Sequence, residues 1–264
     1  MSPHAHGDPW PVIRVLGIFA IWMYVITPLI IKSKQKMDAK TGFEHFDPNN
    51  LPPAVVSHFF NNVQALVNQG FVVSAYLTKA NAVTNATPIL IYLVNRQTGD
   101  KATIAAIQTN VNGVTQFRSQ YLEYTSRFTD DTWISTNNIG TVGAFKPTPQ
   151  GRTTRFAGLN DPGLLYRIHK FVVGKYAPNK TKVLPEPGKE VEGFEKSYRE
   201  SFEKQAEMGL LTLNATQGYY VTTFYGAYYM TLSLLWPFKQ LRLLANKQEA
   251  ARVMADFRRH GGFV

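Results

Sequence analysis

Histidine and carboxylate side chains are the groups through which this chain could bind a metal or move a proton, because its 264 residues include no cysteine. The absence of cysteine excludes disulfides, thiolate metal sites and cysteine nucleophiles. Two of the six histidines, His4 and His6, lie near the N-terminus. Pro3 lacks the backbone N–H that an amino-terminal copper site would have to deprotonate, so these two offer only loose metal binding.

A second group of possible ligands, Glu44, His45 and Asp47, combines carboxylate oxygens with an imidazole within four residues. The same stretch carries Asp47-Pro48 and Pro52-Pro53, which are typical of a linker. We therefore interpret residues 43–53 as a polar linker and predict no metal site there.

Two further histidines, His58 and His169, stand beside apolar residues in segments that read as helices. A histidine in such a place is more often a hydrogen-bonded partner at the edge of a core than a ligand or a base. Asp130-Asp131 follows a predicted strand and could act as a paired acid, but two consecutive aspartates are also typical of a turn. We predict the turn.

No local catalytic motif is present. The chain lacks Gly-x-Ser-x-Gly, His-Glu-x-x-His, Gly-x-Gly-x-x-Gly and the phosphate-loop Gly-Lys-Ser/Thr. Sites assembled from distant residues leave no such trace, so an enzyme with a dispersed active site stays open. Our prediction is that the chain has no catalytic residue, metal ligand or cofactor.

The elements that would position any site follow an α+β order. Short turns such as Asn112-Gly113 join consecutive strands, which indicates antiparallel pairing. Asp161 and Pro162 mark the cap and first position of a helix. The predicted helices cover residues 54–69, 162–176, 191–208 and 238–259, and the predicted strands cover 71–78, 89–95, 102–108, 114–128 and 132–136, with one short strand within 137–158 and a hairpin of 210–213 with 219–223.

Residues 12–31 predict a transmembrane helix, because twenty apolar residues with one charge rise about 30 Å, the thickness of a hydrocarbon core. A cleavable signal peptide would have basic residues before the run and a small-x-small site after it. Here the lysines follow the run. Gly17 and Ala20 form a small patch where another helix could approach. The predicted membrane anchors are Trp10, Arg14, Trp22, Tyr24, Lys32, Lys34 and Lys36.

Charge predicts the orientation of this helix. Residues 32–40 carry +3, whereas Asp8 and Arg14 cancel on the other side. By the positive-inside rule the N-terminus lies outside and the main domain in the cytoplasm, at a bacterial-type inner membrane. The uncharged run of residues 219–238 could be a second span, but its many tyrosines and threonines suit a segment docked to the domain or in the interface. A single span also keeps the basic C-terminal tail on the same side.

The C-terminal tail predicts a basic amphipathic helix that contacts anionic lipid headgroups. It carries +4 and, with residues 32–40, accounts for +7 of the net +10. Nucleic acid is therefore not an expected partner, and the surface of the helix of residues 191–208 carries carboxylates that would repel phosphates, namely Glu195, Glu200, Glu203 and Glu207. The basic residues of the tail are Lys239, Arg242, Lys247, Arg252, Arg258 and Arg259.

The predicted organisation has seven parts. They are a short extracytoplasmic tail (1–11), the transmembrane helix (12–31), a basic juxtamembrane segment and linker (32–53), an α+β domain (54–176), a linker (177–190), a helix with a hairpin and an apolar segment (191–237), and the basic tail (238–264).

These features favour a non-catalytic accessory or scaffold subunit that stabilises a larger integral-membrane complex, a bioenergetic one for example, with other membrane subunits as partners. A membrane-tethered sensor or ligand-binding domain is the first alternative, because helices over an antiparallel sheet often enclose a pocket. The second alternative is the enzyme with a dispersed site.

Overall fold

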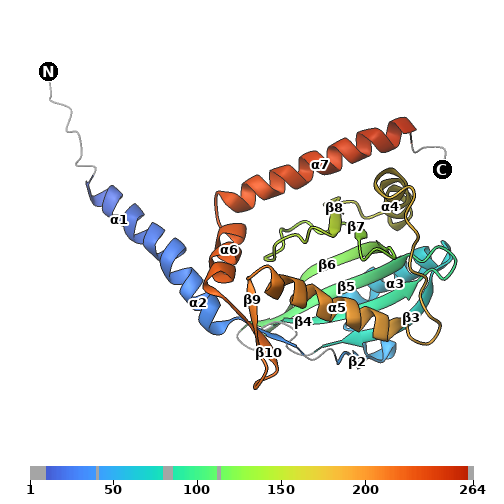
Figure 1. Cartoon of the computed structure of the whole chain (residues 1–264), viewed down its shortest axis with the longest axis horizontal. Coiled ribbons are helices and arrows are strands. Elements are labelled where there is room, and N and C mark those ends of the chain that lie inside the picture. Colours follow the sequence, from blue (N-terminus) through green and yellow to red (C-terminus); the bar gives the residue numbers. More distant parts are fainter. Residues whose placement is uncertain (1–9, 40–41, 80–85, 112–113, 261–264) are drawn as a thin grey trace.

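The computed structural model describes residues 10–39, 42–79, 86–111 and 114–260, and they form the mixed α+β architecture of Figure 1. Residues 1–9, with His4 and His6, and the predicted Asn112-Gly113 turn lie outside the described residues. The main sheet has seven strands in the order of the chain. These are β2 (Glu44–His45), β3 (Val72–Thr78), β4 (Ala86–Val94), β5 (Lys101–Val111), β6 (Val114–Arg127), β7 (Trp133–Asn137) and β8 (Gly151–Arg155).

Helices cover both faces of this sheet. On one face α3 (Pro53–Val67) and α4 (Pro162–Tyr176) pack against the main core, and on the other face lies α5 (Glu190–Glu207). Strand β4 is buried on both faces: Ile91 and Leu93 belong to the α3–α4 core, and Leu90 and Tyr92 belong to the α5 side. Strands β5 and β6 alternate differently. Ala102, Ile104, Leu122 and Tyr124 belong to the α3–α4 core, whereas the α5 side carries the polar residues Lys101, Thr103, Glu123 and Thr125 as well as Ala105 and Tyr121.

The predicted helices and strands of this domain are confirmed within a few residues. Asp161 caps α4, as expected, by accepting a hydrogen bond from the Leu164 N–H at 3.0 Å. One pairing differs from the antiparallel expectation, since β8 runs parallel to β7. The loop between them is long enough to return the chain to the start of β7. Gly151 begins β8 beneath the indole of Trp133, where any Cβ would overlap the ring.

The apolar N-terminal segment is a continuous helix made of α1 (Trp10–Ile21), a π-helical turn η1 (Trp22–Ile26) and α2 (Thr27–Lys34). The π turn precedes Pro28, which has no N–H to give to the preceding turn. The Thr27 N–H and its Oγ1 both donate to the Trp22 carbonyl instead. Within the described ranges this is the one helix long and apolar enough to cross a membrane, with a mean hydropathy of 2.0, and signal sequences share these two properties.

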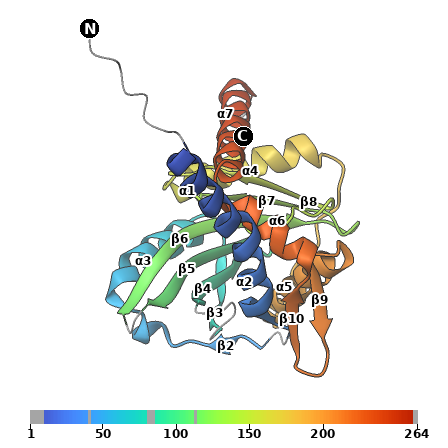
Figure 2. The same ribbon diagram turned by 90° about the vertical axis from the view of Figure 1, so that its left-hand side faces the viewer.

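A small second sheet joins the two ends of the chain. Its strands are β1 (Lys36–Asp38), β10 (Tyr219–Thr222) and β9 (Leu211–Asn214), all antiparallel. The β9–β10 hairpin is confirmed, but β1 was not predicted because three residues of a lysine-rich segment carry no strand pattern. The uncharged run of residues 219–238 is divided between β10, α6 (Phe224–Leu234) and the corner at Trp236-Pro237. Both views place α6 beside α2 (Figures 1 and 2).

The predicted C-terminal helix is present as α7 (Phe238–His260). Its second half packs on the domain, with Val253 and Phe257 buried in the α3–α4 core. Two ion pairs fix it there, from Lys175 to Asp256 at 2.5 Å and from Arg152 to Glu249 at 2.6 Å. The apolar residues of its first half, Leu241 and Leu244, are exposed.

Two stretches predicted as linkers contain short ordered elements. Residues 43–53 include β2 and a 3-10 turn η2 (Pro48–Asn50). In residues 177–190, Lys182 forms a β-bridge with Phe128, and the Val183 N–H donates to the Arg127 carbonyl at 2.9 Å. These segments therefore lie against the sheet rather than apart from it.

Candidate functional site

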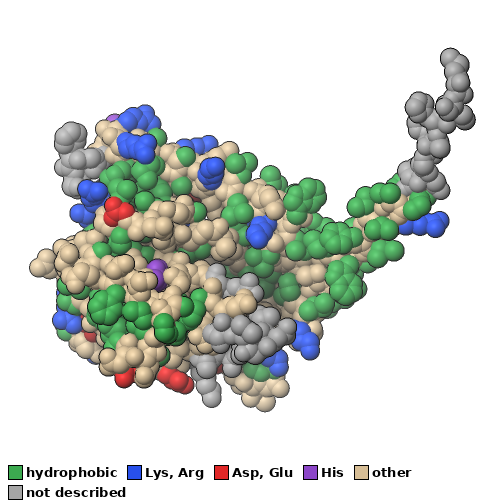
Figure 3. All heavy atoms as spheres, turned by 180° about the vertical axis from the view of Figure 1, so that it is seen from behind, with side chains coloured by type: hydrophobic (Ala, Val, Ile, Leu, Met, Phe, Trp, Pro, Cys, Tyr) green, Lys and Arg blue, Asp and Glu red, His purple; other side chains and the backbone are tan. Residues whose placement is uncertain are grey.

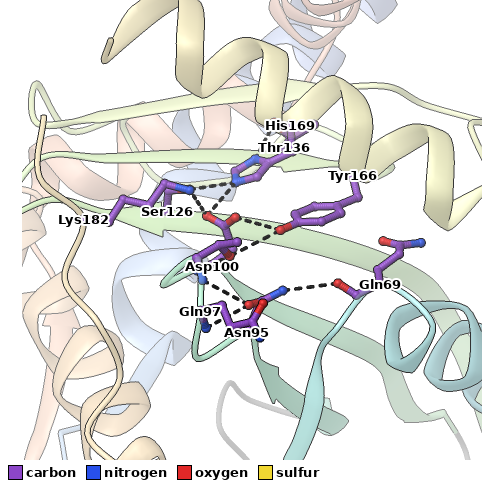
Figure 4. Close-up of polar contacts among 10 residues, drawn as sticks. Gln69, Asn95, Gln97, Asp100, Ser126, Thr136, Tyr166, His169 and Lys182 are labelled. Atoms are coloured by element: carbon purple, nitrogen blue, oxygen red, sulfur yellow. Dashed lines mark hydrogen bonds and ion pairs between the residues drawn. The ribbon is translucent and has the colours of Figure 1, made fainter. Parts of the chain in front are cut away.

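A buried polar cluster lies between the sheet and α4 (Figure 4). Asp100, in the turn before β5, is fully buried and accepts three hydrogen bonds. The donors are Ser126 Oγ of β6 at 2.5 Å, Tyr166 of α4 at 2.9 Å and the Lys182 ammonium at 2.5 Å. Four segments far apart in the sequence thus meet on one carboxylate.

His169 of α4 completes this cluster and is also fully buried. Its Nε2 lies 3.0 Å from Ser126 Oγ and its Nδ1 lies 3.1 Å from Thr136 Oγ1. Because the Ser126 hydroxyl donates to Asp100, it must accept from the histidine, which places the ring proton on Nε2. Burial lowers the pKa of His169 to about 4. The negative charge of Asp100 opposes this shift, and the positive charge of Lys182 adds to it. The ring is therefore neutral at pH 7.

The charge of Asp100 is kept in the core by its partners. Burial pushes its pKa up, but His169, Lys182 and the hydrogen bonds from Lys182 and Ser126 outweigh burial, and the pKa lies below its ordinary value. The adjoining turn is fixed by Asn95, whose Oδ1 accepts from the Gln97 and Thr98 N–H groups at 3.1 Å each.

Serine, histidine and aspartate occur together here, but their arrangement is not that of a hydrolytic triad. In a triad the histidine stands between the serine and the carboxylate. Here Ser126 bonds Asp100 directly, and the second nitrogen of His169 bonds a threonine. All three side chains are buried. The cluster is suited to hold the β4–β5 turn, β6 and α4 together, and a substrate has no access to it.

The other residues with predicted chemistry are dispersed. His58 lies on α3 with its Nδ1 3.3 Å from Asn62 Nδ2, and burial lowers its pKa. Asp47 caps η2 by accepting from the Asn49 N–H at 2.9 Å. In the part of the chain that the structure describes, no group of three His, Asp or Glu side chains could hold a metal ion.

The turn predicted at Asp130-Asp131 is confirmed. Asp130 accepts from the Thr132 N–H at 3.1 Å and from its hydroxyl at 2.6 Å, and Asp131 takes a φ of +61°. Side chains of this type reach their own backbone two residues later and tolerate the left-handed region.

The N-terminal apolar helix and α6 both carry exposed apolar side chains. Every described residue of α1 is exposed, including Trp10, Arg14, Gly17, Ala20 and Ile21, and nothing lies within 4 Å of a Cβ added at Gly17. Figure 3 shows apolar side chains along the whole projecting helix. This helix extends past the domain, so the side chains of its first half are exposed.

The second half of the helix is attached to the domain. Tyr24 donates to the Trp236 carbonyl at the α6–α7 corner. The Lys32 ammonium stands 4.4 Å from the Phe224 ring centre, and that of Lys36 stands 4.6 Å from the Tyr219 ring. Trp22, another predicted anchor, is exposed. The apolar surface continues from the helix onto exposed residues of α6, of the corner after it and of α7, namely Phe224, Tyr225, Tyr228, Leu232, Leu234, Trp236, Phe238, Leu241 and Leu244.

The basic residues predicted for the lipid interface lie along the length of α7. Arg242 donates to the Gly143 carbonyl at 3.2 Å and stands over the Tyr229 ring. Arg259 pairs with Asp256 at 2.9 Å. Lys239 begins the helix beside the corner, Lys247 is exposed in its middle, and Arg252 lines a surface cavity.

A cavity of about 260 Å³ lies between α5 and the opposite face of the sheet. Its floor carries Lys101 and Thr103 of β5 opposite Thr125 and Glu123 of β6. The remaining lining residues are Tyr92, Arg127, Asp131, Trp133, Thr148, Phe194, Ser197, Tyr198, Glu200, Ser201 and Lys204.

Sequence reasoning correctly predicted that His169 is a hydrogen-bonded partner rather than a ligand, but it missed the rest of the Asp100 cluster and the polar floor of the cavity. The cavity floor had a usable signal, because the polar residues at alternate positions of β5 and β6 must share one face of the sheet. The cluster around Asp100 had no signal in the sequence, because the partners of this carboxylate come from β6, α4 and the segment after α4. In comparisons with known proteins, the chain matches no family model, no curated protein and no solved structure.

Proposed function

We propose that this chain is a membrane-anchored, non-catalytic accessory or scaffold subunit that stabilises a larger integral-membrane complex. The observation that carries this proposal is the exposure of the projecting helix. Every residue of its first half, α1, is exposed, although α1 is a well-formed apolar helix. In a bilayer, such a surface is available to lipid and to the helices of other subunits.

Three further features support the proposal. The π turn at η1 interrupts the regular helix, and such turns frequently mark functional positions. Gly17 stands in open space, so a second helix could approach the backbone closely. The Asp100 cluster is closed and structural, which favours a supporting role over hydrolysis. On the α3 side, Phe60 is 71% exposed and adds an apolar contact surface on the domain itself.

The same proposal places the domain in the cytoplasm of a bacterial-type cell, with the N-terminus outside. Lys32, Lys34 and Lys36 at the end of the helix support this orientation through the positive-inside rule. The first half of α7 extends the apolar surface beside basic side chains, and we propose that it contacts anionic headgroups as an amphipathic segment.

The proposal is tested by isolating the full chain from its own membranes in a mild non-ionic detergent. We expect it to migrate in a large complex with other membrane subunits in fixed stoichiometry. A Gly17→Leu variant fills the small patch and should release the chain from the complex, whereas Ile18→Leu keeps apolar bulk beside it and should not. A monodisperse monomer in the wild type would contradict the proposal.

The orientation can be tested separately, because the chain has no cysteine and a single introduced thiol is unique. Thr216 lies exposed in the β9–β10 turn. A Thr216→Cys variant should react with a membrane-impermeant maleimide only after the cells are permeabilised. Labelling in intact cells would place the domain on the other side.

A further inference from the structure

The cavity under α5 is continuous with a second hollow at the same helix. The second cavity, about 360 Å³ in volume, lies between α5 and the segment after α4. The two share Tyr92, Lys101, Arg127, Asp131 and Ser197 in their linings. The second cavity by itself already has the volume of a small-molecule site.

One wall of the inner cavity is aromatic and held in place. Tyr92 of β4 packs on Phe194 of α5 with ring centres 4.9 Å apart, and Tyr198 packs edge-on against Phe43 at 5.2 Å. Trp133 of β7 also lines this cavity. Rings fixed by one another offer an apolar surface whose shape is set before a ligand arrives.

Most charges around the cavity are already compensated. Arg127 binds Glu200 at 2.7 Å and Asp131 at 3.1 Å. Glu123 accepts from Asn137 Nδ2 at 2.9 Å. Burial raises the pKa of Glu123, and its hydrogen bonds from Asn137, Ser135 and Thr125 and the charge of Arg155 only partly oppose this shift.

The ammonium groups of Lys101 and Lys204 are not compensated in this way, and of these two residues only Lys101 also lines the second cavity. Among the described residues the Lys101 ammonium makes no hydrogen bond and no ion pair, whereas its backbone pairs with β4 and β6. Burial and the neighbouring charge of Arg127 lower the pKa of Lys101, and the charge of Glu200 opposes them. Glu200 already forms an ion pair with Arg127. The ammonium therefore lacks a counter-charge at the junction of two cavities, where desolvation is costly.

We propose that this cavity binds a small organic monoanion, with its carboxylate or equivalent headgroup on Lys101 and its apolar body against Tyr92, Phe194 and Tyr198. The anion supplies the counter-charge that the fold does not, and the aromatic wall removes the apolar body from water. This site is independent of the proposed scaffold function, since neither the cavity nor its opening involves the projecting helix.

The test uses the full chain in lipid nanodiscs and three probes of similar size, namely benzoate, benzyl alcohol and benzylamine. Saturation-transfer NMR, with empty nanodiscs subtracted, measures each affinity. We expect benzoate to bind about tenfold more tightly than benzyl alcohol, in line with a charge-assisted hydrogen bond, and benzylamine to bind most weakly.

Two variants remove the preference in different ways. Lys101→Met keeps the aliphatic stem and should reduce benzoate binding to the level of benzyl alcohol. Thr125→Asp places a carboxylate opposite Lys101 across the β5–β6 ladder and should have the same effect through a cross-strand ion pair. Lys247→Met, on exposed α7, is the matched control and should change nothing.

Equal affinities for benzoate and benzyl alcohol in the wild type would overturn the proposal. So would a benzoate preference that survives both Lys101→Met and Thr125→Asp, or no binding of any probe at millimolar concentration. The two variants fail independently, so misfolding of one leaves the other decisive. Co-purification with a membrane complex is unaffected by any of these outcomes.

Discussion

Acidification should destabilise the domain through His169. The folded state holds this ring neutral, with a pKa of about 4, whereas the unfolded chain restores a value of 6.5. Between these values the unfolded state binds one more proton than the folded state, so stability falls as the pH falls. The contribution is fully present above pH 6.5 and is lost through the window from pH 6.5 down to 4.

The size of this effect follows from the pKa difference. Each pH unit inside the window is worth about 1.4 kcal/mol, so a change from pH 7.5 to 4.5 should remove about 2 to 3 kcal/mol of unfolding free energy. Asp100 acts in the same direction but mainly below its ordinary pKa of 3.8, outside most of this range. His58 also has a lowered pKa, so a comparison of variants is needed to isolate His169.

The assay is urea unfolding of the full chain in non-ionic detergent, followed by tryptophan fluorescence at pH 7.5 and 4.5. His169→Gln removes the titrating group and retains a polar side chain for Ser126 and Thr136. It should be less stable than the wild type at pH 7.5 but should lose about 2 to 3 kcal/mol less on acidification. His58→Gln retains His169, so on acidification it should still lose the unfolding free energy that His169 accounts for in the wild type. If His169→Gln loses as much as the wild type, the neutral buried histidine is not the cause.

Two further perturbations test contacts that only the tertiary structure creates. Lys182→Met leaves the Asp100 carboxylate buried without its cation and should lower the unfolding free energy by about 3 kcal/mol, whereas the exposed Lys180→Met should have no measurable effect in the same urea assay. Equal effects would show that Asp100 does not depend on Lys182. Gly226→Ala should lower the unfolding free energy by about 1 to 3 kcal/mol, because its Cβ would overlap the backbone carbonyl of Leu210, directly before β9. Limited proteolysis should then cut near α6. Gly193→Ala, on α5 with open space around it, should be neutral or slightly stabilising, and the same cleavage in both variants would refute the packing argument.

Local patterns predicted most elements of this fold. The apolar face of α3, the Asp161-Pro162 start of α4 and the richness of β3 and β4 in Val, Ile and Tyr each depend on neighbouring residues, so their patterns are visible in the sequence. The patterns failed where a partner decides the conformation. Strand β1 exists because residues 36–38 meet β10, and β8 pairs parallel to β7 through a long loop.

The sequence by itself therefore determined the α+β class, the apolar N-terminal helix and the position of its flanking charges, since these follow from composition and short-range periodicity. Only the tertiary structure decided that Asp100, Ser126 and His169 close into one buried cluster, and that Lys101 faces a cavity without a counter-ion. The physical reason is that burial and charge compensation depend on contacts between residues far apart in the chain, and such contacts leave no local pattern.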